Sequence, residues 1–182
     1  MSVSFINKLF KSKSNDDFCT AVVLAAGNSQ RMGKDKILMP LGGAPVIAHT
    51  LKALQSAECI DEIVVVTKYE RLQELADICH DHGISKASKV VVGGKTRLES
   101  SLIGVSNADE RAKYIAIHDG ARPFVTNSLI ERVVHSAHQH GASAPAVSAT
   151  DTVRILNVKG AVVETPSRDL VALSLIHISE PT

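Results

Sequence analysis

Aromatic residues and an excess of one charge are what this 182-residue chain most clearly lacks. It has no tryptophan and only 3% aromatic residues, whereas base-stacking platforms and the aromatic belts of membrane proteins depend on such side chains. Its 20 Lys and Arg are balanced by 19 Asp and Glu, for a formal net charge of +1. That balance leaves no electrostatic footprint for nucleic acid or an anionic membrane. We therefore expect neither a nucleic-acid nor a membrane partner.

Cysteine and long apolar segments are also scarce. The three cysteines, Cys19, Cys59 and Cys79, form no Cys-x-x-Cys pair, which argues against a disulfide framework and a cysteine-rich zinc site. The longest apolar runs are about six residues, far below the roughly 18 that indicate a membrane span. Residues 1–19 begin with a polar, lysine-containing stretch that lacks the apolar core of a secretory signal. We interpret them as a mobile leader in a cytoplasmic protein.

Short apolar runs alternate with helical patterns between residues 20 and 150. Strands are expected at 21–26, 63–66, 90–92, 114–117 and 144–147, and helices after Pro45 and around 72–79, 98–105 and 129–137. A continuous apolar run such as 21–26 is typical of a strand buried on both faces. The alternation predicts a nucleotide-binding α/β domain with a Rossmann-like, doubly wound and mostly parallel sheet.

The pattern changes after residue 150. Apolar segments at 153–156 and 161–163 flank a four-residue loop, which predicts a β-hairpin arm over 151–172 that must pack on something. Residues 173–182 resemble translated read-through of a sequencing-library adapter and are set aside as a non-native tail. We therefore expect that the chain is a C-terminally truncated fragment, and that the natural chain continues differently after about Ala172.

The first strand ends in a turn of small residues, Leu24-Ala25-Ala26-Gly27, followed by the cations Arg31, Lys34 and Lys36. Ligands of open parallel sheets bind at the carboxyl ends of the strands, where small residues let a phosphate approach the backbone. The spacing from Gly27 to Gly33 does not fit a Walker A loop, and no Gly-x-Gly-x-x-Gly is present, which disfavours a nicotinamide cofactor. The alternative is a plain strand–turn–helix corner with surface cations.

Two further loops follow predicted strands. Asp119, at the end of the fourth strand, could hold Mg²⁺, and Arg122 could clamp a second anion; alternatively, Asp119 caps a turn. Gly93-Gly94 could let a flat ring approach the backbone, while Thr96 could simply cap the next helix. Arg154 and Arg168 could serve a ligand, although solvation of the arm is favoured for both.

Together these segments resemble one family. The stretch from Ala25 to Gly33, then Lys36 and Pro40-Leu41-Gly42-Gly43-Ala44-Pro45-Val46, resembles a nucleotidyltransferase signature. Gly93-Gly94-Lys95-Thr96-Arg97 with Ser100, His118-Asp119-Gly120-Ala121-Arg122-Pro123 and Asp151-Thr152 narrow the resemblance to the 2-C-methyl-D-erythritol 4-phosphate cytidylyltransferase family of non-mevalonate isoprenoid biosynthesis. The similarity extends over about residues 20–172.

The resemblance implies an enzyme that transfers CMP from CTP to 2-C-methyl-D-erythritol 4-phosphate and releases pyrophosphate. It implies the following roles: catalysis by Arg31 and Lys36; nucleotide binding by Ala25, Ala26, Gly27, Gly94, Lys95 and Ser100; divalent-cation (Mg²⁺) binding by Asp119; and binding of the polyol phosphate by Arg122, Thr152 and Arg168. The last contacts are expected partly across a homodimer interface formed by the hairpin arm.

Two departures from the family pattern bear on these roles. Lys95 stands where the family often has an acidic residue, and later segments of the family, including a Thr-Pro-Gln stretch and a late catalytic lysine, are missing. A sheet without its last pieces exposes an unpaired edge. We therefore expect the chain as written to be poorly stable and inactive. The alternatives are a cytidylyltransferase for another polyol phosphate, such as ribitol 5-phosphate, and a non-catalytic nucleotide-binding module.

Overall fold

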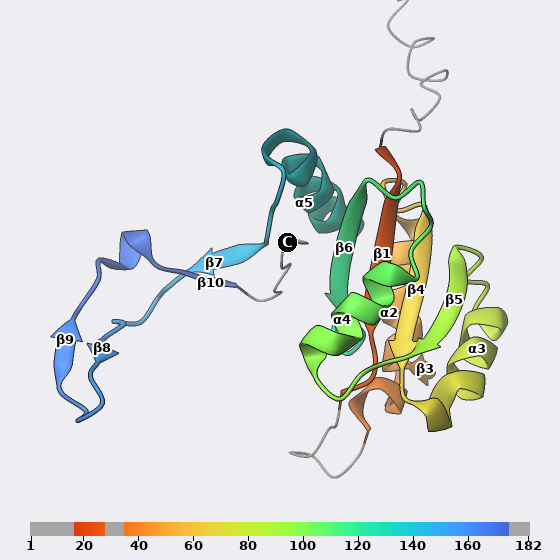
Figure 1. The fold of residues 1–182 in the computed structure, drawn as a ribbon, viewed down its shortest axis with the longest axis horizontal. Helices are drawn as coiled ribbons and strands as arrows, with labels where there is room; N and C mark the ends of the chain where they lie inside the picture. The colour runs from red at the N-terminus through yellow and green to blue at the C-terminus, as the bar shows by residue number, and fades with distance from the viewer. Residues whose placement is uncertain (1–16, 28–34, 175–182) are drawn as a thin grey trace, which may run out of the picture.

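The computed structural model describes residues 17–27 and 35–174. Its centre is a four-stranded parallel sheet in the order β5-β4-β1-β6 (Figure 1). The strands are β1 (Cys19–Leu24), β4 (Glu62–Thr67), β5 (Ala87–Val92) and β6 (Tyr114–Asp119). β1 and β4 are buried along almost their whole length, which explains why both appear in the sequence as continuous apolar runs.

Helices cover both faces of the sheet (Figure 1). They are α2 (Val46–Ser56), α3 (Leu72–Asp81), α4 (Arg97–Ser106) and α5 (Asn127–His140). Gly83 and Gly141, with φ of +65° and +86°, follow α3 and α5, and such left-handed glycines are typical of helix ends. The prediction of a Rossmann-like, mostly parallel α/β fold is confirmed.

The alternation of side chains along β1 divides the core in two. Ala21 and Val23 face one side and pack with α2, α3 and α5, which contribute Ile47, Leu51, Leu54, Leu75, Ile130 and Val134. Val22 faces the other side, with Val66 and Ile117, beneath α4. A Cβ on Gly104 of α4 would lie 2.2 Å from Val22 Cγ1, so this glycine lets the helix approach the sheet closely.

The remaining elements are short. They are the 3₁₀ turns η2 (Lys36–Leu38), η3 (Tyr69–Arg71) and η4 (Arg168–Leu170), and the strands β2 (Pro40–Leu41), β3 (Ala44–Pro45), β7 (Ala146–Ser148), β8 (Ile155–Leu156), β9 (Val162–Glu164) and β10 (Ala172–Ser174). β2 and β3 form a small hairpin immediately before α2. No helix in the described part of the chain is long and apolar enough to cross a membrane.

The fifth strand departs from the sequence prediction. The segment expected at 144–147 forms β7, but β7 pairs antiparallel with β10 and does not join the parallel sheet. Leu173 and Ser174 of β10 pair with Val147 and Ala146. Pairing between segments so far apart in sequence leaves no local signal, so the short apolar run around residue 146 gave no indication of its partner.

The segment after β7 extends away from the sheet (Figure 1). Within it, β8 and β9 pair antiparallel as a hairpin, and Asn157 N–H donates to Ala161 O at 2.9 Å across its loop. The hairpin exposes the apolar side chains of Ile155, Leu156, Val158, Val162 and Val163. β8 is shorter than the stretch 153–156 expected from the sequence, and β9 is shifted by one residue from the expected 161–163.

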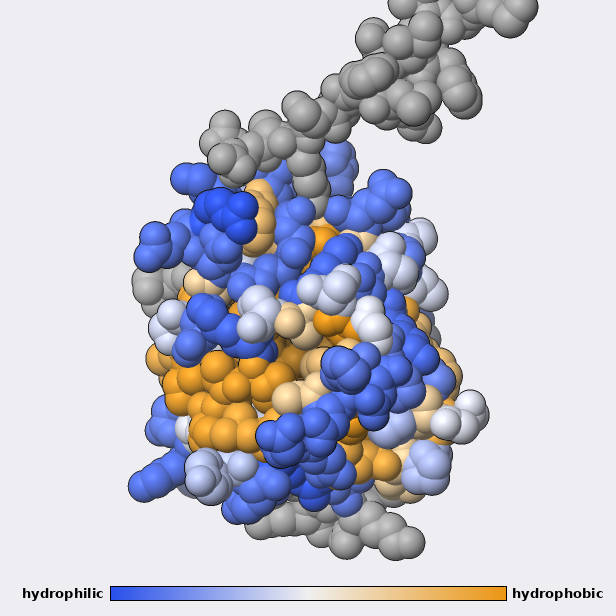
Figure 2. All heavy atoms as spheres, turned by 90° about the vertical axis from the view of Figure 1, so that its right-hand side faces the viewer, coloured by the Kyte–Doolittle hydropathy of each residue, from blue (hydrophilic) through white to orange (hydrophobic). Residues whose placement is uncertain are grey.

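Apolar side chains also gather on the side of the molecule that carries β5 and α3 (Figure 2). A hollow of about 670 Å³ lies there, and its lining includes Leu72, Ala76, Cys79 and Val90. Burial raises the pKa of the Cys79 thiol to about 11, so this cysteine is a neutral packing residue at pH 7. None of the residues that the sequence singled out for chemistry lines this hollow.

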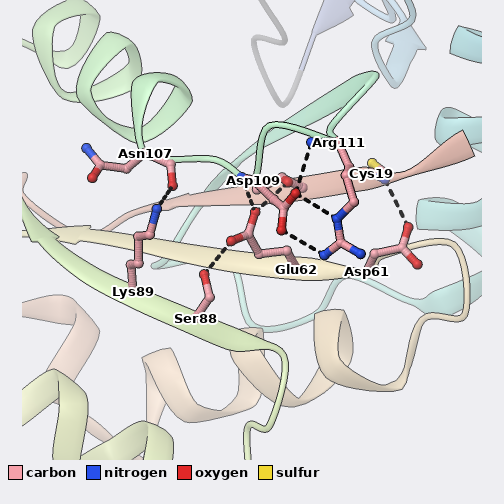
Figure 3. Close-up of polar contacts among 9 residues, drawn as sticks. Cys19, Asp61, Glu62, Ser88, Lys89, Asn107, Asp109 and Arg111 are labelled. Carbon is pink, nitrogen blue, oxygen red and sulfur yellow. Dashed lines mark hydrogen bonds and ion pairs between the residues drawn. The ribbon is translucent and has the colours of Figure 1, made fainter. Parts of the chain in front are cut away.

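A buried carboxylate joins the strands at their amino ends (Figure 3). Glu62, only 6% exposed, accepts hydrogen bonds from Thr20 Oγ1 at 2.7 Å, Ser88 Oγ at 2.5 Å and Asp109 N at 2.8 Å. These donors come from β1, β5 and the loop before β6. One side chain of β4 therefore connects this strand to β1, to β5 and to the loop before β6.

We expect Glu62→Ala to lower the free energy of unfolding by about 3 kcal/mol, because it leaves buried donors without an acceptor. Urea denaturation followed by circular dichroism measures the change. Glu74→Ala is the matched control: Glu74 makes an exposed pair with Arg71 at 3.5 Å, so a loss of about 0.5 kcal/mol or less is expected. Equal losses in the two variants would contradict the structural role of Glu62.

Candidate functional site

A pocket of about 710 Å³ opens at the carboxyl ends of β1 and β6. Four segments line it: the end of β1 with the turn that follows, η2, the loop between β5 and α4 with the first turns of α4, and the end of β6 with the following turn. Leu24 of β1 is in register with Asp119 of β6, and Gly120 N–H donates to Leu24 O at 2.9 Å. The pocket therefore lies at the edge where open parallel sheets bind their ligands.

The turn after β1 and the loop after β5 meet through small residues. Ala25 N–H donates to Val66 O at 2.7 Å, which ties the start of the turn to β4. A Cβ on Gly93 would lie 2.9 Å from Ala26 Cβ and 2.8 Å from Ser100 Oγ, so a larger residue would push the two segments apart. Ala25, Ala26 and Gly27 all line the pocket.

Ser100 holds the loop between β5 and α4 in place. Its hydroxyl accepts from Gly94 N at 3.1 Å and lies 2.9 Å from Thr96 O, to which it donates. Thr96 is the N-cap of α4, and its side chain accepts from Glu99 N at 3.1 Å. The helix cap that the sequence offered as an alternative is therefore present, and it occurs together with a pocket lined by Gly94, Lys95 and Ser100.

Lys36 enters the pocket from η2, next to a fixed backbone. Ile37 beside it is buried, and the Asp35 side chain accepts from Ile37 N at 3.3 Å. Asp35 also pairs with Arg71 at 3.0 Å, which fastens this turn to η3. These contacts position Lys36, which lines the pocket. Arg31, the other expected catalytic cation, lies outside the described residues.

Asp119 lies between two arginines. Arg97 Nη2 donates to its Oδ1 at 2.9 Å, and Arg122 Nε donates to its Oδ2 at 3.0 Å. Partial burial on its own would raise the pKa of Asp119, but the hydrogen bonds and charges of the two arginines outweigh it and hold the pKa below its usual value. Asp119 is therefore ionised at neutral pH. The preceding His118 is buried, and that burial lowers its pKa despite the neighbouring carboxylate, so its ring is neutral.

The charged side chains around the pocket are mainly positive. Four cationic side chains line it, from Lys36, Lys95, Arg97 and Arg122, against the single carboxylate of Asp119 among the described lining residues. The N-terminus of α4 adds its partial positive charge to the same region. Such an arrangement suits a ligand with several negative charges, such as a polyphosphate.

Asp119 is the single carboxylate among the described lining residues, so the pocket offers a cation few protein ligands. The described residues hold no group of three His, Cys, Asp or Glu placed to share a metal ion. Mg²⁺ is commonly held by only one or two carboxylates together with substrate phosphates and water. Asp119 therefore fits a cation that arrives with a polyphosphate, whereas a cage made by the protein alone does not fit.

The pocket brings together most of the residues that the sequence singled out, but not all. Thr152 and Arg168 are exposed and do not line it; Arg168 instead donates from Nη1 to Thr150 O at 3.2 Å. Sequence reasoning gave no role to Arg97, although the Gly-Gly-Lys-Thr-Arg stretch contains it. The sequence could not reveal this role, because it depends on an ion pair with Asp119, which lies 22 positions further along the chain.

The fold places this chain among Rossmann-like α/β proteins, with a pocket lined mainly by cationic side chains at the carboxyl edge of the sheet. The family model for 2-C-methyl-D-erythritol 4-phosphate cytidylyltransferase matches residues 19–176. The chain belongs to this family.

Similar proteins agree with that assignment. A Clostridium botulinum (strain ATCC 19397 / Type A) 2-C-methyl-D-erythritol 4-phosphate cytidylyltransferase is 36% identical over 152 residues, which cover 82% of this chain and 66% of the relative. The Clostridium tetani protein of the same name is 33% identical over 163 residues, covering 88% and 64%. The crystal structure of 4-diphosphocytidyl-2C-methyl-D-erythritol synthase from Anaerococcus prevotii superposes with a TM-score of 0.77 at 27% identity, covering 87% of this chain and 68% of that one. The chain spans just under two thirds of the length of these curated relatives.

Proposed function

We propose that this chain carries the nucleotide site of a cytidylyltransferase that transfers CMP from CTP to 2-C-methyl-D-erythritol 4-phosphate in non-mevalonate isoprenoid biosynthesis. The observation that carries the proposal is the pocket of four cations and one ionised carboxylate at the carboxyl edge of the sheet, in a chain of this family. Its charge suits the triphosphate of CTP.

In the proposed reaction, a phosphate oxygen of the acceptor attacks the α-phosphorus of CTP. A new phosphorus–oxygen bond forms there, the bond from the α-phosphorus to the bridging oxygen breaks, and pyrophosphate leaves with that electron pair. A phosphate monoester has its second pKa near 6, so the attacking group is already mostly dianionic and needs no strong general base. Catalysis then consists of positioning and charge stabilisation.

The residues of this chain take distinct parts in that scheme. Ala25, Ala26 and Gly27 present backbone to the phosphates, and the Gly93–Gly94 turn, braced by Ser100, admits the base and ribose. Lys36, together with Arg31, binds the triphosphate and stabilises the charge that develops at the α-phosphate. Asp119 would hold Mg²⁺ that comes with the nucleotide, and this cation would supply further charge neutralisation.

We place the polyol phosphate near Arg122, with Thr152 and Arg168 supplied across a homodimer interface. Supporting this, the segment that carries these two residues extends from the domain, and its hairpin exposes Ile155, Leu156 and Val162. Apolar side chains gathered on a projecting hairpin are typical of an interaction surface. The cytoplasmic location expected from the sequence stays a prediction.

The test measures nucleotide binding on this chain and turnover on a full-length chain that contains this sequence, because the chain as written is expected to be inactive. CTP, UTP and ATP are titrated by calorimetry with Mg²⁺ present, and pyrophosphate release is then followed with 2-C-methyl-D-erythritol 4-phosphate or ribitol 5-phosphate as acceptor. Preferential CTP binding and release with the first acceptor support the proposal. Release with ribitol 5-phosphate alone would favour the other polyol, and CTP binding without release would favour a binding module. Absence of CTP binding would overturn the nucleotide site itself.

A further inference from the structure

Both oxygens of the Asp119 carboxylate are engaged by guanidinium groups from different parts of the fold. Arg122 lies three residues further along the same turn and contacts Oδ2 at 3.0 Å. Arg97 is the first residue of α4 and reaches Oδ1 at 2.9 Å from the other wall of the pocket. Its side chain is 44% exposed, so it has room to move within the pocket.

This arrangement conflicts with cation binding at Asp119. A carboxylate flanked by two guanidinium groups is a weak ligand for a divalent cation, because their positive charges repel the cation and already occupy one lone-pair site on each oxygen. Departure of one arginine removes part of that repulsion and opens a further lone-pair site. Arg122 is tied to the turn that carries Asp119, whereas Arg97 belongs to a separate element and lines the same pocket as Lys36 and Lys95.

We propose that Arg97 exchanges partners on ligand binding: it is the counter-ion of Asp119 in the free protein, and it moves to a phosphate oxygen of CTP when a divalent cation takes the carboxylate. The guanidinium group suits both states, because its planar set of N–H donors matches carboxylate and phosphate oxygens equally well. The exchange replaces each lost charge contact with another one. This inference rests on the proposed CTP site and gives that site a further nucleotide-binding residue.

The exchange predicts effects of opposite sign in one variant. Arg97→Gln removes a positive charge from beside Asp119 and frees Oδ1, so Mn²⁺ alone should bind about threefold to tenfold more tightly. The same variant lacks a phosphate donor, so CTP in the presence of Mn²⁺ should bind about tenfold more weakly, the scale of one charge-assisted hydrogen bond. A merely structural role would weaken both or change neither.

The experiment titrates Mn²⁺ into the protein, followed by loss of the free-ion electron paramagnetic resonance signal, and then titrates CTP at fixed Mn²⁺ by calorimetry. Binding of Mn²⁺ to CTP in solution is the same for every variant and cancels in the comparison. Arg111→Gln is the matched control, because Arg111 pairs with Asp109 at 2.7 Å at the opposite end of the sheet, and neither affinity should change. Arg97→Lys keeps the charge and should retain most of the CTP affinity.

Mn²⁺ affinity that falls or stays the same in Arg97→Gln would overturn the exchange, as would unchanged CTP affinity. A thermal melt of each variant tests whether the fold is retained. If Arg97→Gln is unfolded, the comparison is repeated with Arg97→Lys. Full loss of CTP binding in a folded Arg97→Lys would also overturn the exchange. Failure of the wild-type chain to bind CTP would instead overturn the proposed function.

Discussion

Lys36→Ala, in a full-length chain that contains this sequence, is expected to slow CMP transfer by at least about 10²-fold, the scale for losing one preorganised donor at a site of developing negative charge. Lys36 lines the pocket from η2, and its backbone is held by the buried Ile37 and by the Asp35–Arg71 ion pair. Because that anchoring does not involve the Lys36 ammonium group, the truncation should remove charge from the pocket and leave the turn in place.

Pyrophosphate release at saturating CTP and acceptor measures the rate, and calorimetry measures CTP affinity, which should fall by about tenfold or more. Lys52→Ala, on the exposed side of α2, is the matched control and should change neither quantity. Turnover close to that of the wild type in Lys36→Ala would refute the assigned role. A loss of affinity with unchanged turnover would limit Lys36 to ground-state binding.

Asp119→Asn is expected to have the second large effect. Turnover should fall by about 10³-fold, and its dependence on divalent cations should be lost. The amide is nearly isosteric and can still accept a hydrogen bond from one arginine, so the fold of the loop should persist. Metal-free CTP binding should stay equal or become stronger, because the variant removes a negative charge that repels the triphosphate and releases Arg97 and Arg122.

The combination of slower turnover and undiminished metal-free affinity is the diagnostic result for Asp119. Turnover is measured across a series of Mg²⁺ concentrations, and CTP binding is measured with a chelator present. Asp109→Asn serves as the control, since Asp109 also pairs with an arginine but at the amino end of the sheet. Turnover in Asp119→Asn that still rises with Mg²⁺ as in the wild type would place the cation elsewhere.

Much of the fold could be predicted because its main elements carry local signals. The apolar runs that became β1 and β4 are buried on both faces, and the glycines at positions 83 and 141 end helices by adopting positive φ. β7 could not be placed, because its partner β10 lies more than twenty residues away, where the expected arm meets the expected non-native tail. Strand pairing depends on such distant partners, and no periodicity in one segment reveals them.

The site could be predicted in part for a related reason. Ala25, Gly94 and Asp119 each lie at or just beyond the carboxyl end of a strand. Parallel strands bring these ends to one edge, so the convergence of the three residues follows from the fold class. Arg97 escaped notice because its role comes from a contact across the pocket. The bracing of the Gly94 turn by Ser100 was likewise invisible, since a serine in the first turns of a helix has no required partner.

The sequence by itself therefore determined the class of fold, the edge of the sheet where the pocket lies and the resemblance that the family match confirms, because these depend on local patterns and fixed motifs. Only the tertiary structure decided how the charges are paired: Asp119 between Arg97 and Arg122 at one end of the sheet, and Glu62 among its three donors at the other. Charge and hydrogen-bond partners are chosen by distance in space, and that distance exists only once the strands have paired and the loops have met.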